Sequence, residues 1–403
     1  MGLEELSIEV VQYFVFGWMR EGRDVLALAL TSKTMYRKIL GELGNENAYD
    51  RDQFRALAGV GACVCNRWWR PARLAVQRGY GDPAEFIELD KGPGNPLCVA
   101  SLEGQTALVK ALLENPKVYP GWLALTQASR GGHAQVVHLL LEDKRVDPTM
   151  DQQSAIRQAG VSGHANVMGV LLRDPRCDPA VVSNFALRYA ARNGHYDVLK
   201  MLMEDGRVNP GDMDNCAICW ASRHGHAESV RLLLSDPRVD PSARNNVCIE
   251  VASRVGNTEV VRVLLEDPRV DPSTNESYAL QWSAYEGYAD IVELLLQDGR
   301  VDGGADDNFA FRFAAQNGHA EVVRLLLTQA SVDPGAHDNA AIRLAASRGH
   351  ASVVDLLIGH PRVDVCGGNH AAYEMAVQQG HTQVVHLLDD WYRQQDEYAH
   401  WYD

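Results

Sequence analysis

The sequence predicts an all-α fold in which short helical pairs stack one after another. Three observations favour it: a turn that usually reads Asp-Pro returns every 31 residues, a glycine usually followed by histidine returns with the same period, and apolar residues between them follow helical spacing. A fixed period of about 20 to 50 residues indicates repeated supersecondary units. The chain of 403 residues is therefore expected to form one long array.

The turn motif is clearest as EDPRVDP at 266–272 and SDPRVDP at 235–241. It recurs because each unit must pass the chain to the next unit in the same geometry. Its acidic position is Asp or Asn at steps of 31 residues: Asp147, Asp178, Asn209, Asp240, Asp271, Asp302, Asp333 and Asp364.

One unit shows the expected elements in order. Residues 339–348 have apolar side chains at helical spacing, with Asn339 as the expected N-cap and Gly349 ending the helix in a left-handed conformation. A second helix is expected over 351–358, before the loop that contains Pro361. Two such helices cannot bury their shared face alone, so neighbouring units must stack.

The segments AARNGHYDVLKMLM (190–203), AAQNGHAEVVRLLL (314–327) and AASRGHASVVDLLI (345–358) resemble the ankyrin repeat, and the resemblance covers roughly 95–390. The usual ankyrin unit has about 33 residues, and the two missing here fall where ankyrins build a β-hairpin. We therefore expect a tight turn in its place. This short-loop form is similar to arrays found in amoeboid protists and giant DNA viruses of amoebae.

The two residues before each glycine vary between units. The resemblance places these positions in the concave groove where ankyrin arrays hold protein partners. Arginine and tyrosine are enriched at binding hot spots, so an acidic or Tyr-rich protein segment is the expected ligand; a solvated face without a dedicated partner is the alternative. The candidate groove residues are Arg192, Asn193, Arg223, His224, Arg254, Tyr285, Glu286, Gln316 and Arg348.

Positions that barely change between units are expected to be structural. The arginines of the turns should neutralise neighbouring aspartates or helix C-terminal carbonyls. The histidines after the glycines should form local hydrogen bonds, because equivalent residues one repeat apart are too distant to share a metal ion. Trp220 and Trp282 occupy one position of the repeat, which is interpreted as core.

The N-terminus breaks the period, and residues 6–36 resemble an F-box. This resemblance implies docking to the adaptor subunit of a cullin–RING ubiquitin ligase, with the target in the ankyrin groove. Ser7 replaces the usual proline and Met35 the usual tryptophan. The alternative is a helical cap on a plain interaction scaffold. The candidate adaptor contacts are Leu6, Glu9, Val10, Val25, Leu28, Ser32 and Lys33.

Composition excludes several classes of function. A net charge of −15 argues against nucleic-acid binding as the main role, and no membrane span or signal peptide is apparent. Eight scattered cysteines suit a reducing compartment, and none forms a complete zinc motif. No catalytic motif is present. We expect a non-enzymatic protein without cofactor or metal, in the cytoplasm or nucleus, or in the host cell if the chain is viral.

The expected domain organisation has four parts. They are an F-box-like segment over 1–44, a linker with a degenerate first repeat over 45–93, an array of about ten units over 94–393, and a tail over 394–403.

Overall fold

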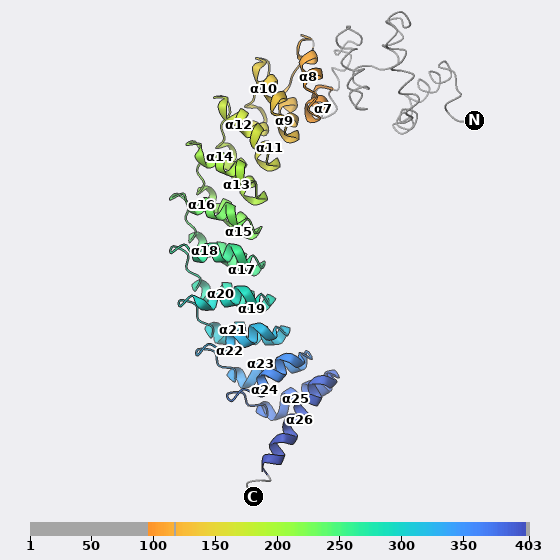
Figure 1. Ribbon diagram of the computed structural model, residues 1–403, viewed down its shortest axis with the longest axis vertical. Coiled ribbons are helices and arrows are strands. Elements are labelled where there is room, and N and C mark those ends of the chain that lie inside the picture. Colours follow the sequence, from red (N-terminus) through yellow and green to blue (C-terminus); the bar gives the residue numbers. More distant parts are fainter. Residues whose placement is uncertain (1–95, 117, 400–403) are drawn as a thin grey trace, which may run out of the picture. The chain divides into compact units, whose positions relative to one another are not determined.

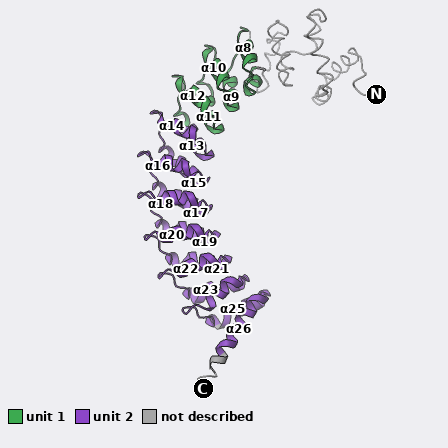
Figure 2. Ribbon diagram, viewed as in Figure 1, with its two compact units in different colours: residues 1–182 green, residues 183–403 purple. Residues whose placement is uncertain are grey.

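The computed structural model describes residues 96–116 and 118–399 (Figure 1). The chain divides into two compact units, 1–182 and 183–403, which are described separately (Figure 2). The candidate F-box-like segment, including Leu6, Val25 and Leu28, lies outside the described residues, as does the expected linker over 45–93.

All regular structure in the described ranges is helical, as predicted. The first unit contains α7 (Pro96–Leu102), α8 (Thr106–Leu113), α9 (Trp122–Gly131), α10 (Ala134–Glu142), α11 (Met150–Ser162) and α12 (Ala165–Arg173). The division falls within α13. The remaining helices are α13 (Val181–Asn193), α14 (Tyr196–Glu204), α15 (Asp212–Arg223), α16 (Ala227–Leu234), α17 (Ala243–Arg254), α18 (Thr258–Leu265), α19 (Thr274–Glu286), α20 (Ala289–Gln297), α21 (Ala305–Asn317), α22 (Ala320–Leu327), α23 (Ala336–Ser347), α24 (Ala351–Ile358), α25 (Gly367–Gln379) and α26 (Thr382–Ala399).

Each repeat is an antiparallel pair of one odd-numbered and one even-numbered helix. Within the second unit the odd-numbered helices form one row and the even-numbered helices another, and each helix packs against its counterpart in the next repeat (Figure 1). The odd-numbered helices, which come first in each repeat and are called the first helices below, contact one another more extensively than the even-numbered second helices do. Alanines such as Ala314 and Ala345, both fully buried, permit this close approach.

The connection between repeats is a tight turn, with no strand in the residues that the structure describes. In the turn before α19, Asp271 Oδ1 accepts the N–H of Ser273 at 3.0 Å and the Ser273 hydroxyl at 2.7 Å. Val270 of the same turn is 1% exposed. Burial of a valine side chain contributes about 1.5–3 kcal/mol, so Val270 fixes this turn against the stack.

The arginines of the turns connect consecutive repeats, which confirms the predicted role. Arg269 pairs with Asp267 at 2.7 Å and donates to the carbonyls of Val239 and Leu234 in the preceding repeat, at 2.8 and 3.1 Å. Its guanidinium group holds the pKa of the Asp267 carboxyl below its usual value. Equivalent ion pairs are made by Arg145, Arg176, Arg207, Arg238 and Arg300.

The glycine and, in most repeats, the histidine that follows it also join neighbouring repeats. Gly318 ends the right-handed helix with φ +81°, and a Cβ added there would lie 2.5 Å from Nδ1 of His350 in the next repeat. The corresponding ring of His319 lies 3.0 Å from the carbonyl oxygen of Tyr285, so its Nε2–H donates to the preceding repeat. The histidine forms a hydrogen bond as predicted, but the predicted local partner is wrong, since the carbonyl lies 34 residues back in the preceding repeat.

Three consecutive residues of α17, Arg244 to Asn246, form a left-handed turn with φ +56° to +58° before the right-handed helix begins. The left-handed conformation costs roughly 1–2 kcal/mol per residue, least for Asn and Asp. Oδ1 of the buried Asn246 accepts the N–H of Asp271, one repeat on, at 2.8 Å. α11, α15, α19, α21 and α23 contain equivalent turns.

This left-handed turn corrects the prediction for Asn339. The N-cap position of α23 is Gly335, and Asn339 lies inside the element, in its left-handed turn. Asn339 has φ +58°, and its Oδ1 accepts the N–H of Asp364 in the following repeat at 2.8 Å. Asn339 therefore joins two repeats, while α24 covers 351–358 as predicted.

Candidate functional site

The first helices of the second unit expose a row of aromatic and arginine side chains, here called the aromatic–arginine face. Its positions lie nine, five and two residues before each glycine, so they are four and three apart and share one helix face. On α13 they are Phe185, Tyr189 and Arg192; on α19 they are Tyr278, Trp282 and Tyr285. Equivalent side chains are Trp220, Arg223, Arg254, Phe309 and Phe313.

The aromatic rings contact one another within and between repeats. Phe185 stacks on Tyr189 at 4.2 Å between ring centroids, and Tyr189 meets the edge of Trp220, one repeat on, at 5.3 Å. A second group forms where Trp282 contacts Tyr285 at 5.6 Å. Such pairs contribute about 0.5–1.5 kcal/mol beyond their burial, so the rings hold one another in fixed positions.

Arginines lie over these rings. The Arg192 guanidinium carbon is 5.6 Å from the centroid of Tyr189 and 5.6 Å from that of Trp220. The same atom of Arg254 is 5.4 Å from the Trp282 centroid. Cation–π contact of this kind holds a guanidinium group in place without neutralising its charge, so the charge stays available to a partner.

One carboxylate lies close to these arginines. Burial raises the pKa of Glu250, while its hydrogen bond to Asn275 and the charge of Arg254 act in the opposite direction. Arg192 and Arg223 are exposed and have no ion pair with a carboxylate in the described structure. Of the three arginines, Arg254 is therefore the one whose charge is partly offset by a nearby carboxylate.

A polar atom of the face also lacks a partner. Nε1 of Trp282 is buried and makes no hydrogen bond to the described residues, although the residue as a whole is half-buried. A buried donor left unpaired costs about 1–3 kcal/mol.

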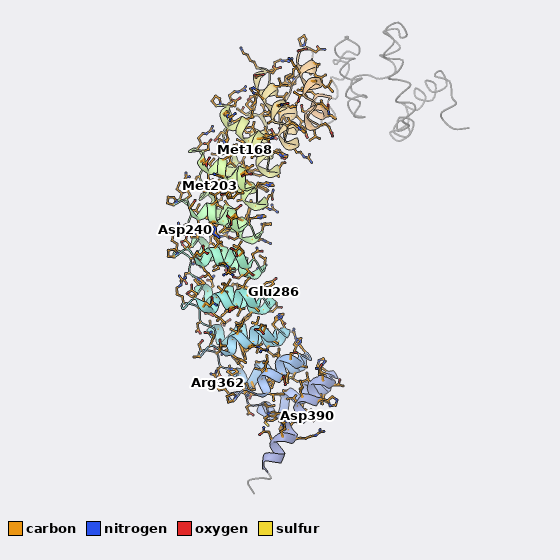
Figure 3. The ribbon with its side chains drawn as sticks, viewed as in Figure 1. Met168, Met203, Asp240, Glu286, Arg362 and Asp390 are labelled. Carbon is orange, nitrogen blue, oxygen red and sulfur yellow. The ribbon has the colours of Figure 1, made fainter. Side chains whose placement is uncertain are left out.

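The structure places the predicted groove residues at the C-terminal ends of the first helices. In Figure 3, Glu286 lies on the side of the second unit opposite Asp240 and Arg362, which mark the turns. Gln316 is half-buried, and the other eight are exposed: Arg192, Asn193, Arg223, His224, Arg254, Tyr285, Glu286 and Arg348. Their role in binding stays a prediction.

Arg348 and His224 make hydrogen bonds to neighbouring residues of the array. Arg348 Nη1 donates to Asn317 Oδ1 at 3.1 Å, and Asn317 Nδ2 in turn donates to the Tyr285 carbonyl at 2.9 Å. His224 Nδ1 lies 2.8 Å from the Trp220 carbonyl oxygen. Arg348 and His224 thus contribute to contacts within the array, whereas Arg192, Arg223 and Arg254 point their charge to the open face.

The interpretation of Trp220 and Trp282 as core residues is wrong. Both are half-buried, together with Tyr189 and Phe313 at the same position, because this side of the first helices lies away from the second helices. Sequence reasoning also missed Phe185, Tyr278 and Phe309. These three residues lie four positions before Tyr189, Trp282 and Phe313, and this spacing could have shown that each pair shares one helix face.

Metal binding and membrane insertion find no support in the described residues. No group of three or more His, Cys, Asp or Glu side chains is placed there to hold a metal ion. Within residues 96–116 and 118–399, no helix is long and apolar enough to cross a membrane.

The comparison with family models agrees with the geometry of the stack. The model described as "Ankyrin repeats (3 copies)" matches residues 97–183, 156–245, 249–338 and 311–395, well over half of the chain. A comparison with curated proteins found no match. Because its paired helices stack repeat on repeat and the family model matches most of its length, the chain belongs to the ankyrin-repeat proteins, whose role is protein–protein interaction.

Proposed function

We propose that the chain binds a target protein by holding an acidic segment of that protein across the aromatic–arginine face. One observation carries the proposal: Arg192, Arg223 and Arg254 occupy the same position of three consecutive repeats, and Tyr285 occupies it in the fourth. Two of these arginines lie over half-buried rings. A row of cations at repeat spacing suits an extended segment with several carboxylates.

The half-buried rings supply the apolar part of such an interface. Arginine, tyrosine and tryptophan are the residue types that contribute most at protein interfaces. Because the rings and guanidinium groups are already held by one another, little side-chain entropy is lost when a partner binds. The partner's aromatic or aliphatic side chains would pack beside Trp220 and Trp282 while its carboxylates reach the arginines.

The test uses two charge-reversal variants of the full-length chain. Arg192, Arg223 and Arg254 are changed to Glu in one; Arg231, Arg262 and Arg324 of the second helices are changed to Glu in the other, as a control with the same change in charge. Proteins captured by wild type are identified, purified and titrated against both variants. We expect the first variant to weaken binding at least 30-fold, since a hot-spot arginine contributes about 2 kcal/mol or more, and the control to bind normally. Equal weakening by both would contradict the proposal.

For the N-terminus we infer a recruiting role, in which residues 1–44 dock the adaptor subunit of a cullin–RING ubiquitin ligase and bring the bound target to it. The support is the F-box-like pattern of Leu6, Glu9, Val10, Val25 and Leu28. Ubiquitin transfer would be performed by the other subunits, and the chain would contribute proximity.

Co-purification of the adaptor subunit with full-length protein and with its Leu28→Asp variant tests this role. Binding that is lost in the variant, with unchanged melting temperature, is the expected result. No binding to either protein, together with a lower melting temperature for Leu28→Asp, would mean that the N-terminus is a cap and the protein a plain scaffold.

The compartment is also a proposal. The scattered cysteines favour the cytoplasm or nucleus, or a host cell if the short-loop resemblance to viral arrays reflects the source. Imaging of the tagged full-length chain in cells tests it, and secretion of the tagged protein would contradict it.

A further inference from the structure

Two thiols from consecutive repeats meet beside the aromatic–arginine face. Cys219 of α15 and Cys248 of α17 lie 2.7 Å apart, sulfur to sulfur. Both are free cysteines. A disulfide bond is about 2.05 Å long, so the sulfurs need to approach by only about 0.65 Å to form one.

The repeat itself shows that this pair is a departure from the pattern. The position of Cys248 is alanine in eight other repeats: Ala124, Ala155, Ala186, Ala217, Ala279, Ala310, Ala341 and Ala372. In the array, this small residue lets the first helices approach closely. Cys248 therefore places a sulfur at a position where eight other repeats place only the methyl group of alanine.

The position of Cys219 departs as well. In most other repeats it holds a long polar side chain, and several of these donate to a carbonyl of their own left-handed turn. Gln281 donates to the Glu276 carbonyl at 2.9 Å, and Arg312 donates to the Asp307 carbonyl at 3.0 Å. Cysteine at this position gives up that bond. Cys98 of α7 also occupies the Cys219 position, but in the described repeats the two departures fall together only in α15 and α17, at two positions that touch.

The two thiols differ in environment. Cys219 is half-buried, whereas Cys248 is 0% exposed. The hydrogen bond from the Cys248 thiol lowers the pKa of Cys219, and that same bond together with burial raises the pKa of Cys248. Since the thiolate is the reactive form, an oxidant should react first with the Cys219 sulfur. The Cys248 sulfur is already in contact with it and can then form the disulfide.

We propose that Cys219 and Cys248 are an oxidation site that forms a reversible disulfide between neighbouring repeats on exposure to a peroxide. The Cys219 thiolate attacks one peroxide oxygen and the O–O bond breaks, giving a sulfenic acid and, after protonation, one water. The Cys248 sulfur then attacks the Cys219 sulfur and displaces the hydroxyl group as a second water. Two thiols and one hydrogen peroxide thus give one disulfide and two waters, and a dithiol reductant reverses the reaction.

The bond would fix α15 to α17 within the stack. Trp220 follows Cys219 directly in sequence and belongs to the aromatic–arginine face. The oxidised protein would therefore present Trp220 and Arg223 in a more rigid arrangement. The site itself does not depend on what the face binds.

The experiment treats reduced full-length protein with hydrogen peroxide, alkylates the remaining thiols and maps tryptic peptides without reduction. Cys219 lies in peptide 208–223 with Cys216, and Cys248 lies in peptide 245–254. The expected product links these two peptides and disappears after dithiothreitol. The exposed Cys366 reports that peroxide has acted on every sample.

Three variants assign the bond. Cys248→Ala has the residue of the other repeats and should fold normally, and it should lose the link, as should Cys219→Ser. Cys216→Ser, one helical turn from Cys219, should keep it. Absence of the link in wild type when Cys366 is oxidised, or loss of the link in Cys216→Ser alone, would overturn the proposal. A melting temperature that rises by several degrees on oxidation of wild type, and not of Cys248→Ala, is the second expected result.

Discussion

Replacement of Asn246 by alanine removes a side chain that joins two consecutive repeats. Asn246 is 5% exposed and has φ +58°. Its Oδ1 accepts the backbone N–H of Asp271 at 2.8 Å. Alanine can occupy the volume but cannot accept this bond, and it tolerates the left-handed conformation less well than asparagine does.

The two losses can be estimated separately. Leaving the Asp271 N–H unpaired costs about 1–3 kcal/mol, because the group is shielded from water by the packed turn. The less favourable backbone conformation adds about 1 kcal/mol. The Asn246→Ala variant should therefore lower the free energy of unfolding by about 2–4 kcal/mol.

Asn245 provides the matched control. It has φ +57° in the same left-handed turn, but its side chain is exposed and makes no bond to the next repeat in the described structure. Asn245→Ala should lower the free energy of unfolding by about 1 kcal/mol, the conformational part alone. The assay is equilibrium unfolding in urea, followed by circular dichroism and compared at the midpoint and slope. Equal losses in both variants would refute the inter-repeat bond as the source of stability.

Further predictions concern the other contacts between repeats. Arg269→Ala should cost about 2 kcal/mol, since it loses two carbonyl bonds and an ion pair; Arg262→Ala, which loses one exposed ion pair on α18, should cost about 0.3–0.5 kcal/mol in the same urea assay. Burial lowers the pKa of His226 in the folded protein, so its contribution is present above pH 6.5 and is lost as the pH falls through the folded pKa. The next repeat has asparagine, Asn257, at the position of His226. In the His226→Asn variant the melting temperature should therefore fall less between about pH 7 and 5 than in wild type, and an unchanged pH profile would contradict this. Gly318→Ala should lower the melting temperature by several degrees, because it combines φ +81° with a contact to His350; a wild-type melting temperature would contradict it.

Much of the fold follows from the sequence because the same residue returns at the same position. The glycine that ends each first helix, the histidine after it and the arginine of the turn were each assigned a structural role from their constancy. Gly318, His319 and Arg269 fulfil those roles. Constancy reveals that a position is structural, yet it does not reveal the partner, which in all three cases lies in a neighbouring repeat.

The left-handed turns could not be predicted in this way. Residues such as Arg244 to Asn246 are compatible with an ordinary N-cap, and sequence alone favours the cheaper conformation. What stabilises the left-handed form is the bond from Asn246 to Asp271, a contact between segments 25 residues apart. The conformation of these turns depends on the stacking of repeats, which the local sequence does not predict.

The aromatic–arginine face was only partly predictable for a related reason. Apolar side chains at helical spacing show that a helix has an apolar face, but not which neighbour covers it. Trp220 and Trp282 were assigned to the core because burial was inferred from residue type. In the stack, the second helices cover the opposite side of α15 and α19, so the same rings lie half-buried on the open side.

Once the spacings of contacts are known, departures from the repeat gain meaning. Asparagine side chains meet the next turn 25 residues on, turn arginines meet a carbonyl 30 residues back, and histidines meet a carbonyl 34 residues back. Each position therefore has a known partner position. A substitution at only one of two partner positions weakens their contact, whereas substitutions at both positions can create a new contact. Cys219 and Cys248 replace a polar side chain and an alanine at two positions 29 residues apart, and their sulfurs touch. The double departure identifies this pair as a contact with a chemistry of its own, which the peroxide experiment can establish or reject independently of the partner held by the arginines.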